Sequence, residues 1–410
     1  MSPDIMRKVD YWIGIPLAWC VTLWYKLQRA LGLKNPRYQE PPKRVLFIEL
    51  AEMGSTILAY PAFRKFRELY PEAEIYFLVF RQNAPTADLV DLIPKQNVLT
   101  IDSSNPWRFF LGTIGIILKT RRLGIDTVVN LEMFARYSTI LSYLTGARKR
   151  AGFYRFFNEG LYVGDFLTHK VPYNPHIHTA QSFITLVRSL AEDQSDVPLG
   201  KFSVQDDDLS LPVIRPNTNE QSRVWEILRD AAPHISQKHT IVILNPNASK
   251  LIEVRRWPIG RYTDLAKKIV QERPDTYVVV MGSASERAEA ETIVSACASD
   301  RVLNLAGKTT LMELVHLFSV ADVLVTNDSG PAHFASLTPI HIMVFFGPET
   351  PKLYKPLSKN ATILYSWFAC SPCVSVHNQR RTPCTANKCL GAIEVEEVYK
   401  KVSSLLDTKA

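Results

Sequence analysis

Residues 321–335, ADVLVTNDSGPAHFA, join an apolar run to a segment that begins with a proline. The apolar run from Val323 predicts a buried strand, and the turn-forming residues NDSG at 327–330 end it. Pro331 then favours the first turn of a helix. A strand, a tight turn and a helix N-terminus in this order direct backbone N–H groups and the positive end of a helix dipole at one point above the sheet. Such a point suits an anion such as phosphate.

Three residues in this stretch are candidates for contact with a ligand. Asp328 can accept a hydrogen bond from a hydroxyl or cap the helix, and Gly330 lets a ligand approach the backbone. His333 lies one turn into the helix. The alternative is an N-cap aspartate and a turn glycine with no ligand, and the stretch alone does not decide between the two interpretations.

Length and composition indicate two globular domains. A chain of 410 residues exceeds what one core usually holds, and 46% hydrophobic with 21% charged residues is typical of folded protein. The formal net charge of +8 fits an anionic ligand or a negative membrane surface. Nucleic-acid binding is not expected, because the sequence has no zinc-finger spacing, no RNP-like aromatic motif and no long basic run.

Four of the six cysteines lie close together, at Cys370, Cys373, Cys384 and Cys389. Six cysteines spaced so unevenly do not make a disulfide framework, which favours a reducing compartment. The spacing C-x2-C-x10-C-x4-C leaves three interpretations open. The thiolates hold zinc or an iron–sulfur cluster, two of them form a disulfide, or all are free buried thiols.

The segment 11–25, YWIGIPLAWCVTLWY, carries no charge and has basic residues on both sides. Fifteen helical residues span about 22 Å, less than the roughly 30 Å of a bilayer's hydrocarbon. We therefore expect residues 11–33 to form a helix that lies in the membrane surface; a tilted span and a helix packed on the protein itself are the alternatives. No small-residue cleavage site follows the run, so a cleaved signal peptide is not expected. The Pro-rich segment 35–43 is interpreted as a linker.

Apolar runs of strand length alternate with helical patterns along the rest of the chain, which predicts βαβ units and parallel sheets. The first series of strands is expected at 44–50, 74–80, 97–101 and 126–131, with helices at 56–69 and 107–118. The second is expected at 240–244, 277–281, 301–304, 321–326 and 340–346, with helices at 219–231, 260–271 and 285–297. A weakly patterned stretch separates the two series, so the expected division is an N-terminal segment (1–43), a first α/β domain (44–205) and a second α/β domain (206–410).

Ligands of parallel sheets bind beyond the carboxyl ends of the strands, so the loops there are candidate sites. The loop 245–258, NPNASKLIEVRRWP, offers Asn247 and Ser249 as donors and Arg255 and Arg256 as cations. A guanidinium fork matches two phosphate oxygens at once. The alternative is a basic loop in water.

Two further loops of the second domain follow predicted strands. The loop 281–287, MGSASER, offers Glu286 for a ribose diol, although a glutamate in a first helical turn is also ordinary charge placement. The loop 305–311, LAGKTTL, lacks the spacing of a Walker A loop, which disfavours a nucleoside triphosphatase.

Three parts of the chain resemble glycosyltransferase family 9, the ADP-heptose:lipopolysaccharide heptosyltransferases and their relatives. They are VLFIELAEMGSTILAYPAF, NPNAS followed by RRWP, and VTNDSGPAHFAS followed by FFGPETP. The resemblance covers roughly residues 44–400. It implies the GT-B architecture, in which two Rossmann-like domains face a cleft, the first for the acceptor and the second for the nucleotide sugar. It also implies inverting, metal-independent transfer with no bound cofactor.

The resemblance also implies roles for individual residues by their position. Ser249 and Arg255 would contact the pyrophosphate, and Glu286 the ribose. The final helix, 394–406, would pack back towards the first domain. The residues that would line the nucleotide-sugar site are Asp328, Ser329, Gly330 and His333.

The first loop departs from the family pattern, in which Gly-Asp supplies the aspartate that is proposed as general base. This chain has Gly54 and Ser55 there. A serine hydroxyl cannot take a proton from an acceptor alcohol at neutral pH, whereas a carboxylate can. Glu52, inside the loop, is the expected replacement, and Glu49 is the second candidate. A chain that has lost catalysis, or that drives it differently, is the third interpretation.

These observations together predict a bacterial glycosyltransferase that moves a heptose or similar sugar from a nucleotide-diphosphate sugar to a lipopolysaccharide-type or lipid-linked glycan acceptor. We expect a peripheral protein on the cytoplasmic side of the inner membrane, because nucleotide sugars are cytoplasmic and lipid acceptors lie in the membrane. Basic residues within 119–155 are interpreted as a surface for a phosphorylated or lipid-linked acceptor, or as a solvated face. The alternative functions are a catalytically inactive nucleotide-sugar-binding or scaffold protein of the same fold, and a sugar-nucleotide epimerase.

Overall fold

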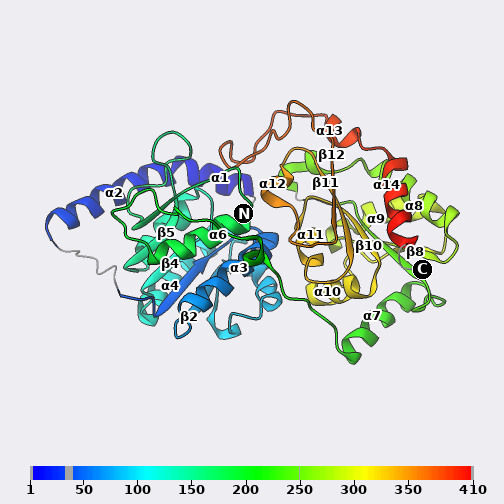
Figure 1. The fold of residues 1–410 in the computed structure, drawn as a ribbon, viewed down its shortest axis with the longest axis horizontal. Coiled ribbons are helices and arrows are strands. Elements are labelled where there is room, and N and C mark those ends of the chain that lie inside the picture. Colours follow the sequence, from blue (N-terminus) through cyan, green and yellow to red (C-terminus); the bar gives the residue numbers. More distant parts are fainter. Residues whose placement is uncertain (1–2, 33–39, 249, 408–410) are drawn as a thin grey trace. The chain divides into compact units, whose positions relative to one another are not determined.

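The computed structural model describes residues 3–32, 40–248 and 250–407. The chain divides into two compact units, Met1–Ser210 (unit 1) and Leu211–Ala410 (unit 2), close to the expected boundary between residues 205 and 206. Each unit holds a six-stranded sheet with helices packed on it (Figure 1). Every pair of neighbouring strands is parallel. The expectation of two parallel α/β domains is therefore confirmed.

The sheet of unit 1 has the strand order β3-β2-β1-β4-β5-β6. The sequence pattern does not predict β5, because its first two residues, Lys149 and Arg150, are charged and yet buried. The strands are β1 (Arg44–Ile48), β2 (Glu74–Phe80), β3 (Val98–Ile101), β4 (Thr127–Asn130), β5 (Lys149–Tyr154) and β6 (His169–Pro172). The helices are α1 (Pro3–Trp12), α2 (Gly14–Ala30), α3 (Met53–Leu69), α4 (Pro106–Leu123), α5 (Arg136–Leu144) and α6 (Thr179–Arg188).

Side chains of β1 alternate between the two faces of its sheet, and different helices cover each face. Phe47 contacts Phe63 and Phe66 of α3, with ring centroids 4.8 and 5.5 Å apart. Leu46 and Ile48 lie in a separate core with side chains of α4 and α5. α6 packs beside α3. The unit is therefore a three-layer sandwich in which α4 and α5 lie on the face opposite α3.

Helix α2 packs on α5 through one face of small and polar residues, Gly14, Ala18, Thr22 and Tyr25. Residues at this spacing lie one above another on a helix, and small side chains let two helices approach closely. The Tyr25 and Tyr143 rings meet edge-on at 6.0 Å. The alternative of a helix packed on the protein itself therefore holds for this face of α2.

Other parts of α2 are exposed, including Trp19, Leu23 and Trp24. Within the described ranges, no helix combines the length and apolarity needed to cross a membrane. The predicted linker at 35–43 lies largely outside the described residues.

The sheet of unit 2 has the strand order β12-β11-β10-β7-β8-β9. The half-buried edge strand β12 is not predicted by the sequence pattern. The strands are β7 (Thr240–Asn245), β8 (Thr276–Val280), β9 (Val302–Asn304), β10 (Val323–Asn327), β11 (His341–Phe346) and β12 (Ala361–Tyr365). The helices are α7 (Thr218–Ala231), α8 (Ile259–Glu272), α9 (Arg287–Cys297), α10 (Leu311–Val320), α11 (Gly330–Ala335), α12 (Pro351–Tyr354), α13 (Lys388–Gly391) and α14 (Val395–Asp407).

The final helix, α14, packs on α8 of its own unit. Its apolar residues Val398, Val402 and Leu406 lie on one face and belong to the core that contains Trp257 and Phe345. The buried face of this helix therefore belongs to unit 2.

The close contact between α2 and α5 leaves no room for a side chain at Gly14. A Cβ there would lie 3.0 Å from Cβ of Arg136, which is buried and paired with Asp10. We expect Gly14→Leu to lower the free energy of unfolding by about 1–3 kcal/mol, as overpacking does. Gly115→Leu is the matched control, because Gly115 lies in α4 with open space around it and a leucine favours a helix. Thermal unfolding of both variants tests this, and equal stability would show that α2 does not pack tightly on α5.

Candidate functional site

Four neighbouring strands of unit 2 end at the same edge of the sheet, and polar residues follow three of them there. Along the sheet, Glu349 follows β11, Asp328 follows β10, Asn247 follows β7 and Gly282 follows β8. Because these strands are adjacent and parallel, the residues after them lie along one edge of the sheet. We refer to them as the carboxyl edge of unit 2.

Arg255 and Asp328 form a largely buried ion pair at this edge. The Nη1 atom of Arg255 lies 3.3 Å from Oδ2 of Asp328, and the two side chains are 13% and 7% exposed. Burial raises the pKa of Asp328, and the charge of Arg255 and its hydrogen bond oppose that rise. Nε of Arg255 makes no hydrogen bond within the described part of the chain. A desolvated guanidinium with a remaining donor is suited to an anionic oxygen.

Glu349 is a second buried carboxyl group at the carboxyl edge, and sequence reasoning assigned it no role. It is 1% exposed, and neither of its oxygens accepts a hydrogen bond from the described residues; Nε of Arg380 lies 3.8 Å from Oε1. Burial, with the nearby charge of Asp328, raises the pKa of Glu349 to about 8. The side chain is therefore mostly protonated at neutral pH and can donate a hydrogen bond. The available signal was a carboxylate directly after an apolar strand, in FFGPETP.

Hydrogen bonds tie the loop after β7 to the loop after β10. Asn327 accepts at Oδ1 from the backbone N–H of Trp257, at 2.8 Å, and donates from Nδ2 to the carbonyl of Pro246, at 3.0 Å. Asn245 donates to Oγ of Ser329 at 3.2 Å. Trp257 is buried against Phe345, so the loop that carries Arg255 is anchored in the core. The loops that carry Arg255 and Asp328 are therefore held together by hydrogen bonds and by the packing of Trp257.

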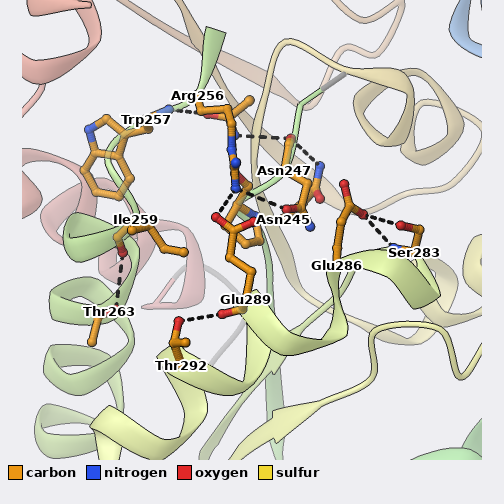
Figure 2. A network of polar contacts seen from close by, with 12 residues as sticks. Asn245, Asn247, Arg256, Trp257, Ile259, Thr263, Ser283, Glu286, Glu289 and Thr292 are labelled. Carbon is orange, nitrogen blue, oxygen red and sulfur yellow. Dashed lines mark hydrogen bonds and ion pairs between the residues drawn. The ribbon is translucent and has the colours of Figure 1, made fainter. Parts of the chain in front are cut away.

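Arg256 forms polar contacts with other residues of unit 2, as Figure 2 shows. Its Nη2 atom donates to Oδ1 of Asn247 at 3.3 Å and also to the carboxylate of Glu289. Its Nε donates to the carbonyl of Pro246 at 3.2 Å. The charge of Arg256 is thus matched by Glu289, and its hydrogen bonds hold the loop after β7 in place.

Asn247 and Glu286 are brought together across Gly282. A Cβ at Gly282 would lie 2.7 Å from Nδ2 of Asn247 and 3.2 Å from Cβ of Glu286, so only glycine fits between them. Oε2 of Glu286 accepts from the backbone N–H of Ser283 at 2.7 Å and from its hydroxyl at 2.8 Å (Figure 2). These bonds close a capping box, which is the ordinary structural role of such a glutamate. They engage one carboxylate oxygen and fix the direction of the other.

The helix after β10 is capped by a different residue from the one suggested by the sequence. Ser329 is the N-cap residue of α11, and Asp328 instead turns to Arg255. Helix α11 has only six residues, with Gly330 as the first, and His333 is buried within it. The Oγ atom of Ser329 donates to the carbonyl of Asn327 at 3.1 Å. The predicted helix N-terminus is therefore present but belongs to a short helix, and Arg255 and Asp328 supply the charges beside it.

The predicted pyrophosphate contact Ser249 lies outside the described residues. The four clustered cysteines are free thiols, and of these Cys389 is buried while Cys370 and Cys384 are exposed. In the described ranges, no group of three or more histidine, cysteine, aspartate or glutamate side chains is placed to hold a metal ion. The metal and disulfide interpretations therefore gain no support, and the expectation that all four thiols are buried is wrong.

The first loop of unit 1 is shorter than expected. Because α3 begins at Met53, Gly54 and Ser55 lie in its first turn, and Glu52 is its N-cap residue. The hydroxyl of Ser55 donates to Oε2 of Glu52 at 3.2 Å. Glu49 follows β1 and is only 5% exposed, whereas Glu52 is half-buried. The structure thus pairs Ser55 with Glu52 and leaves Glu49 deeper in the unit.

A third carboxyl group, Glu132, lies at the same loop and was not anticipated. Its Oε1 atom accepts from the backbone N–H of Leu50 at 2.7 Å. Burial raises the pKa of Glu132, and the N–H groups of Leu50 and Ala51 oppose that rise. Its position directly after the strand predicted at 126–131 was the signal in the sequence. Glu132 holds the loop in place through two backbone N–H groups.

The family model described as "Glycosyltransferase family 9 (heptosyltransferase)" matches residues 121–382. Lipopolysaccharide heptosyltransferase 2 of Salmonella typhimurium is 34% identical over 113 residues, which are 27% of this chain and 32% of that protein. The lipopolysaccharide core heptosyltransferase OpsX of Haemophilus influenzae is 23% identical over 321 residues, which are 77% of this chain and 82% of that protein. The matches to the first curated relatives span about a third to a half of the length of those proteins.

Among solved structures, the ADP-heptose lps heptosyltransferase II of E. coli superposes with a TM-score of 0.68. It is 20% identical, and the superposition covers 90% of this chain and 100% of that chain. At this level of identity the likeness is one of fold. It agrees with the two parallel α/β units described above.

The raised pKa of Glu349 predicts an unusual dependence of stability on pH. The folded protein holds this proton more tightly than the unfolded chain, whose carboxyl has an ordinary pKa of 4.5, so stability falls as pH rises from 4.5 to about 8. We expect Glu349→Gln, which does not titrate, to be more stable than the unchanged protein at pH 7, by ~3 kcal/mol. The difference should shrink towards pH 5, and thermal unfolding between pH 5 and pH 9 measures it.

Glu313→Gln is a control in the same unit, because the pKa of Glu313 is lowered in the folded protein whereas that of Glu349 is raised. The backbone N–H of Thr310 holds the pKa of Glu313 below its usual value. This group therefore stabilises the folded protein above its unfolded pKa, and its contribution is lost as pH falls. Glu313→Gln should be less stable than the unchanged protein at pH 7, with a smaller difference at low pH. If Glu349→Gln followed the same pattern, Glu349 would be ionised in the folded protein.

Proposed function

Because the chain belongs to glycosyltransferase family 9, we propose that it transfers a heptose or a similar sugar from a nucleotide-diphosphate sugar to a lipopolysaccharide-type or lipid-linked glycan acceptor. The single observation that carries the proposal is the buried pair of Arg255 and Asp328, at the carboxyl edge that the family uses for its donor. The relatives are named for heptosyl transfer.

In this proposal the diphosphate of the donor binds at Arg255. A phosphate oxygen accepts from Nε of Arg255, which makes no hydrogen bond to the described residues, while Nη1 stays paired with Asp328. Asn247 and Glu286 lie farther along the carboxyl edge, after β7 and β8. The carboxylate oxygen of Glu286 that the capping box leaves unused suits a ribose hydroxyl. Ser249 completes the pyrophosphate contact that the family resemblance implies. Protonated Glu349 donates to an oxygen of the donor.

On the acceptor side, we assign Glu52 as the general base. Its carboxylate removes the proton of an acceptor hydroxyl, and the hydroxyl oxygen attacks the anomeric carbon on the face opposite the diphosphate. The new carbon–oxygen bond forms as the bond to the diphosphate breaks, and the electron pair leaves with the diphosphate. The anomeric configuration is therefore inverted. Arg255 stabilises the charge that accumulates on the leaving group, and the proposed reaction needs no metal ion.

We also propose that the protein is peripheral to the cytoplasmic face of the inner membrane. The support is that the tryptophans at 12, in α1, and at 19 and 24, in α2, are 54% to 74% exposed. Indole rings favour the interface between water and lipid. A lipid-linked acceptor would lie in the same membrane.

A second candidate function is nucleotide-sugar binding without turnover. Ser55 favours it, because the family places an aspartate at that position and serine is no base at neutral pH. The hydrogen bond from Ser55 to Glu52 favours catalysis instead, since it orients a carboxylate one turn away.

Donor binding should depend on the fork of Arg255 and not only on its charge. Arg255→Lys keeps a cation beside Asp328, so the fold is retained, but it loses the bidentate geometry. We expect the affinity for ADP or another nucleoside diphosphate to fall about tenfold or more, as the loss of one charge-assisted hydrogen bond predicts. Calorimetric titration measures this, with Arg229→Lys on the exposed face of α7 as the matched control. Equal affinity in the two variants would remove Arg255 from the donor site.

Transfer should require the carboxylate of Glu52. We expect Glu52→Gln to lower the turnover by about a hundredfold or more while donor affinity stays unchanged, because a general base contributes about 10²–10⁴. Ser55→Ala should lower it much less, and Glu49→Gln should leave it near normal. The assay uses ADP-heptose with a heptose-deficient lipopolysaccharide acceptor, in excess chelator throughout.

Each outcome of this assay identifies one interpretation. Normal turnover by Glu52→Gln with loss in Glu49→Gln would move the base to Glu49. Donor binding with no turnover by the unchanged protein, across a panel of sugars, would support the binding protein. Loss of activity in chelator alone would contradict metal-independent transfer.

A further inference from the structure

Helix α4 carries a second exposed apolar surface of unit 1, which the proposed function does not use. Its exposed residues follow the spacing i, i+3, i+4, i+7 and i+11, so they form one stripe along the helix. Their exposed fractions run from 39% to 67%, and the Trp107 and Phe110 rings stack at 6.0 Å. The stripe consists of Trp107, Phe110, Leu111, Ile114 and Leu118. A water-facing helix surface normally carries polar side chains at these positions.

Helices α2 and α4 lie on either side of α5. At the start of α5, the ring of Tyr137 lies 4.8 Å from that of Phe109 on α4. At its end, the hydroxyl of Tyr143 hydrogen bonds to Gln28 of α2 at 2.9 Å, and Nε of Arg121 on α4 donates to the carbonyl of Leu144 at 2.9 Å. The three helices therefore form one layer, in which the end of α2 and the end of α4 meet over the end of α5.

A groove of roughly 400 Å³ lies where these helix ends meet. α2 contributes Trp24 to its wall and α4 contributes Arg121. The full lining is Cys20, Val21, Trp24, Gln28, Arg121, Tyr143, Leu144 and Gly146. The groove is apolar along α2 and cationic at α4. The bond from Arg121 to Leu144 uses Nε and leaves the guanidinium head exposed.

Positive charge accumulates at this end of the layer. Arg121 also lines an adjacent hollow of roughly 620 Å³ with Lys43, Arg148 and Lys149, beside the acidic residues Glu40 and Asp126. The end of helix α4 at the groove carries Lys119, Arg121 and Arg122, and the helix contains no acidic residue. Arg29 lies in the last turn of α2. An apolar face with a cationic end matches an anionic lipid surface, in which acyl chains lie beside phosphate groups.

We propose that the outer surfaces of α2 and α4 form one lipid-docking face, and that Arg121 in the groove between them binds the phosphate of an anionic lipid. This inference rests on the proposed membrane association and adds a second helix and a headgroup site to it. Two attachment points fix the orientation of unit 1 on the bilayer, which a single helix would leave free to rotate about its axis. Two weak anchors also bind more stably than one.

A second copy of the chain is a poorer occupant of this face. Closed dimers usually form around a two-fold axis, which brings the same patch of each copy together. The cations of α4, among them Lys119 and Arg122, would then face their own copies with no acidic residue of α4 between them. Like charges across an interface are unfavourable, whereas lipid phosphates neutralise them.

The test is sedimentation of the full chain with phosphatidylcholine vesicles, with and without phosphatidylglycerol. The chain should bind the anionic vesicles and release them in high salt. Leu111→Asp with Leu118→Asp on α4, and Leu23→Asp with Leu27→Asp on α2, should each lower the affinity about tenfold or more, because each pair removes two apolar side chains from the lipid. Leu69→Asp is the matched control, since Leu69 is 43% exposed at the end of α3, on the opposite layer.

The headgroup site is tested by two adjacent arginines. Arg121→Gln keeps a donor for the carbonyl of Leu144 but loses the charge in the groove, and Arg122→Gln removes an exposed charge that does not line the groove. Removal of one surface charge costs about fivefold in membrane affinity, so Arg122→Gln should cost no more than this and Arg121→Gln clearly more. Equal losses would show that only net charge matters and would overturn the headgroup site.

Other outcomes separate this inference from the proposed function. If the α4 pair bound vesicles like the unchanged chain while the α2 pair did not, the two-helix face would be wrong and membrane association by α2 would stand. If the unchanged chain ignored anionic vesicles, both would fail, although donor binding in unit 2 would be unaffected. Light scattering could instead show a dimer that becomes a monomer in the variant with Leu111→Asp and Leu118→Asp. This result would assign the face to a second copy of the chain and overturn the proposal of lipid docking.

Discussion

The buried pair of Arg255 and Asp328 sets the charge balance at the carboxyl edge of unit 2. A lone buried charge is very unfavourable, so each of these residues requires the other. Glu349 lies near them, with Nε of Arg380 3.8 Å from its carboxyl group, and burial together with the charge of Asp328 raises its pKa to about 8. With Glu349 protonated, the three side chains carry no net charge. The edge can therefore remain desolvated and still offer one cation and one neutral hydrogen-bond donor, a combination that suits an anionic donor substrate.

Much of the fold follows from local sequence, because parallel strands buried on both faces are apolar runs. The run from Val323, the turn NDSG and the alternation with helical segments predicted five of the six strands in the sheet of unit 2, and only the edge strand β12 was missed there. β5 was missed since Lys149 and Arg150 are buried there, and their partners come from distant segments: the guanidinium of Arg150 donates to the carbonyl of Phe166. A local pattern carries no information about such a partner.

The candidate site was predictable as a set of loops and unpredictable in its contacts. Asp328 and Ser329 are neighbours, and which of them caps α11 depends on the backbone angles of one residue. Arg255 and Arg256 are likewise neighbours, yet they point to Asp328 and to Glu289 in the structure. The raised pKa of Glu349 results from its burial, and this burial depends on how the whole unit packs. Sequence reasoning therefore placed the residues at one edge and could not assign each its partner.

Helix α2 has one face that is buried against α5 and another whose large apolar side chains are exposed. Its sequence from Gly14 is apolar on nearly every side, which in a water-soluble protein would indicate a fully buried helix. Only one face is buried, however, and that face uses Gly14, Ala18 and Thr22, which are small enough for close approach to α5. The large side chains, Trp19 and Trp24 among them, are on the outside, the reverse of what a water-soluble protein favours. Packing on α5 therefore explains the small residues and leaves the tryptophans without a reason. The proposed lipid surface would supply that reason, and it would also account for the exposed stripe of α4.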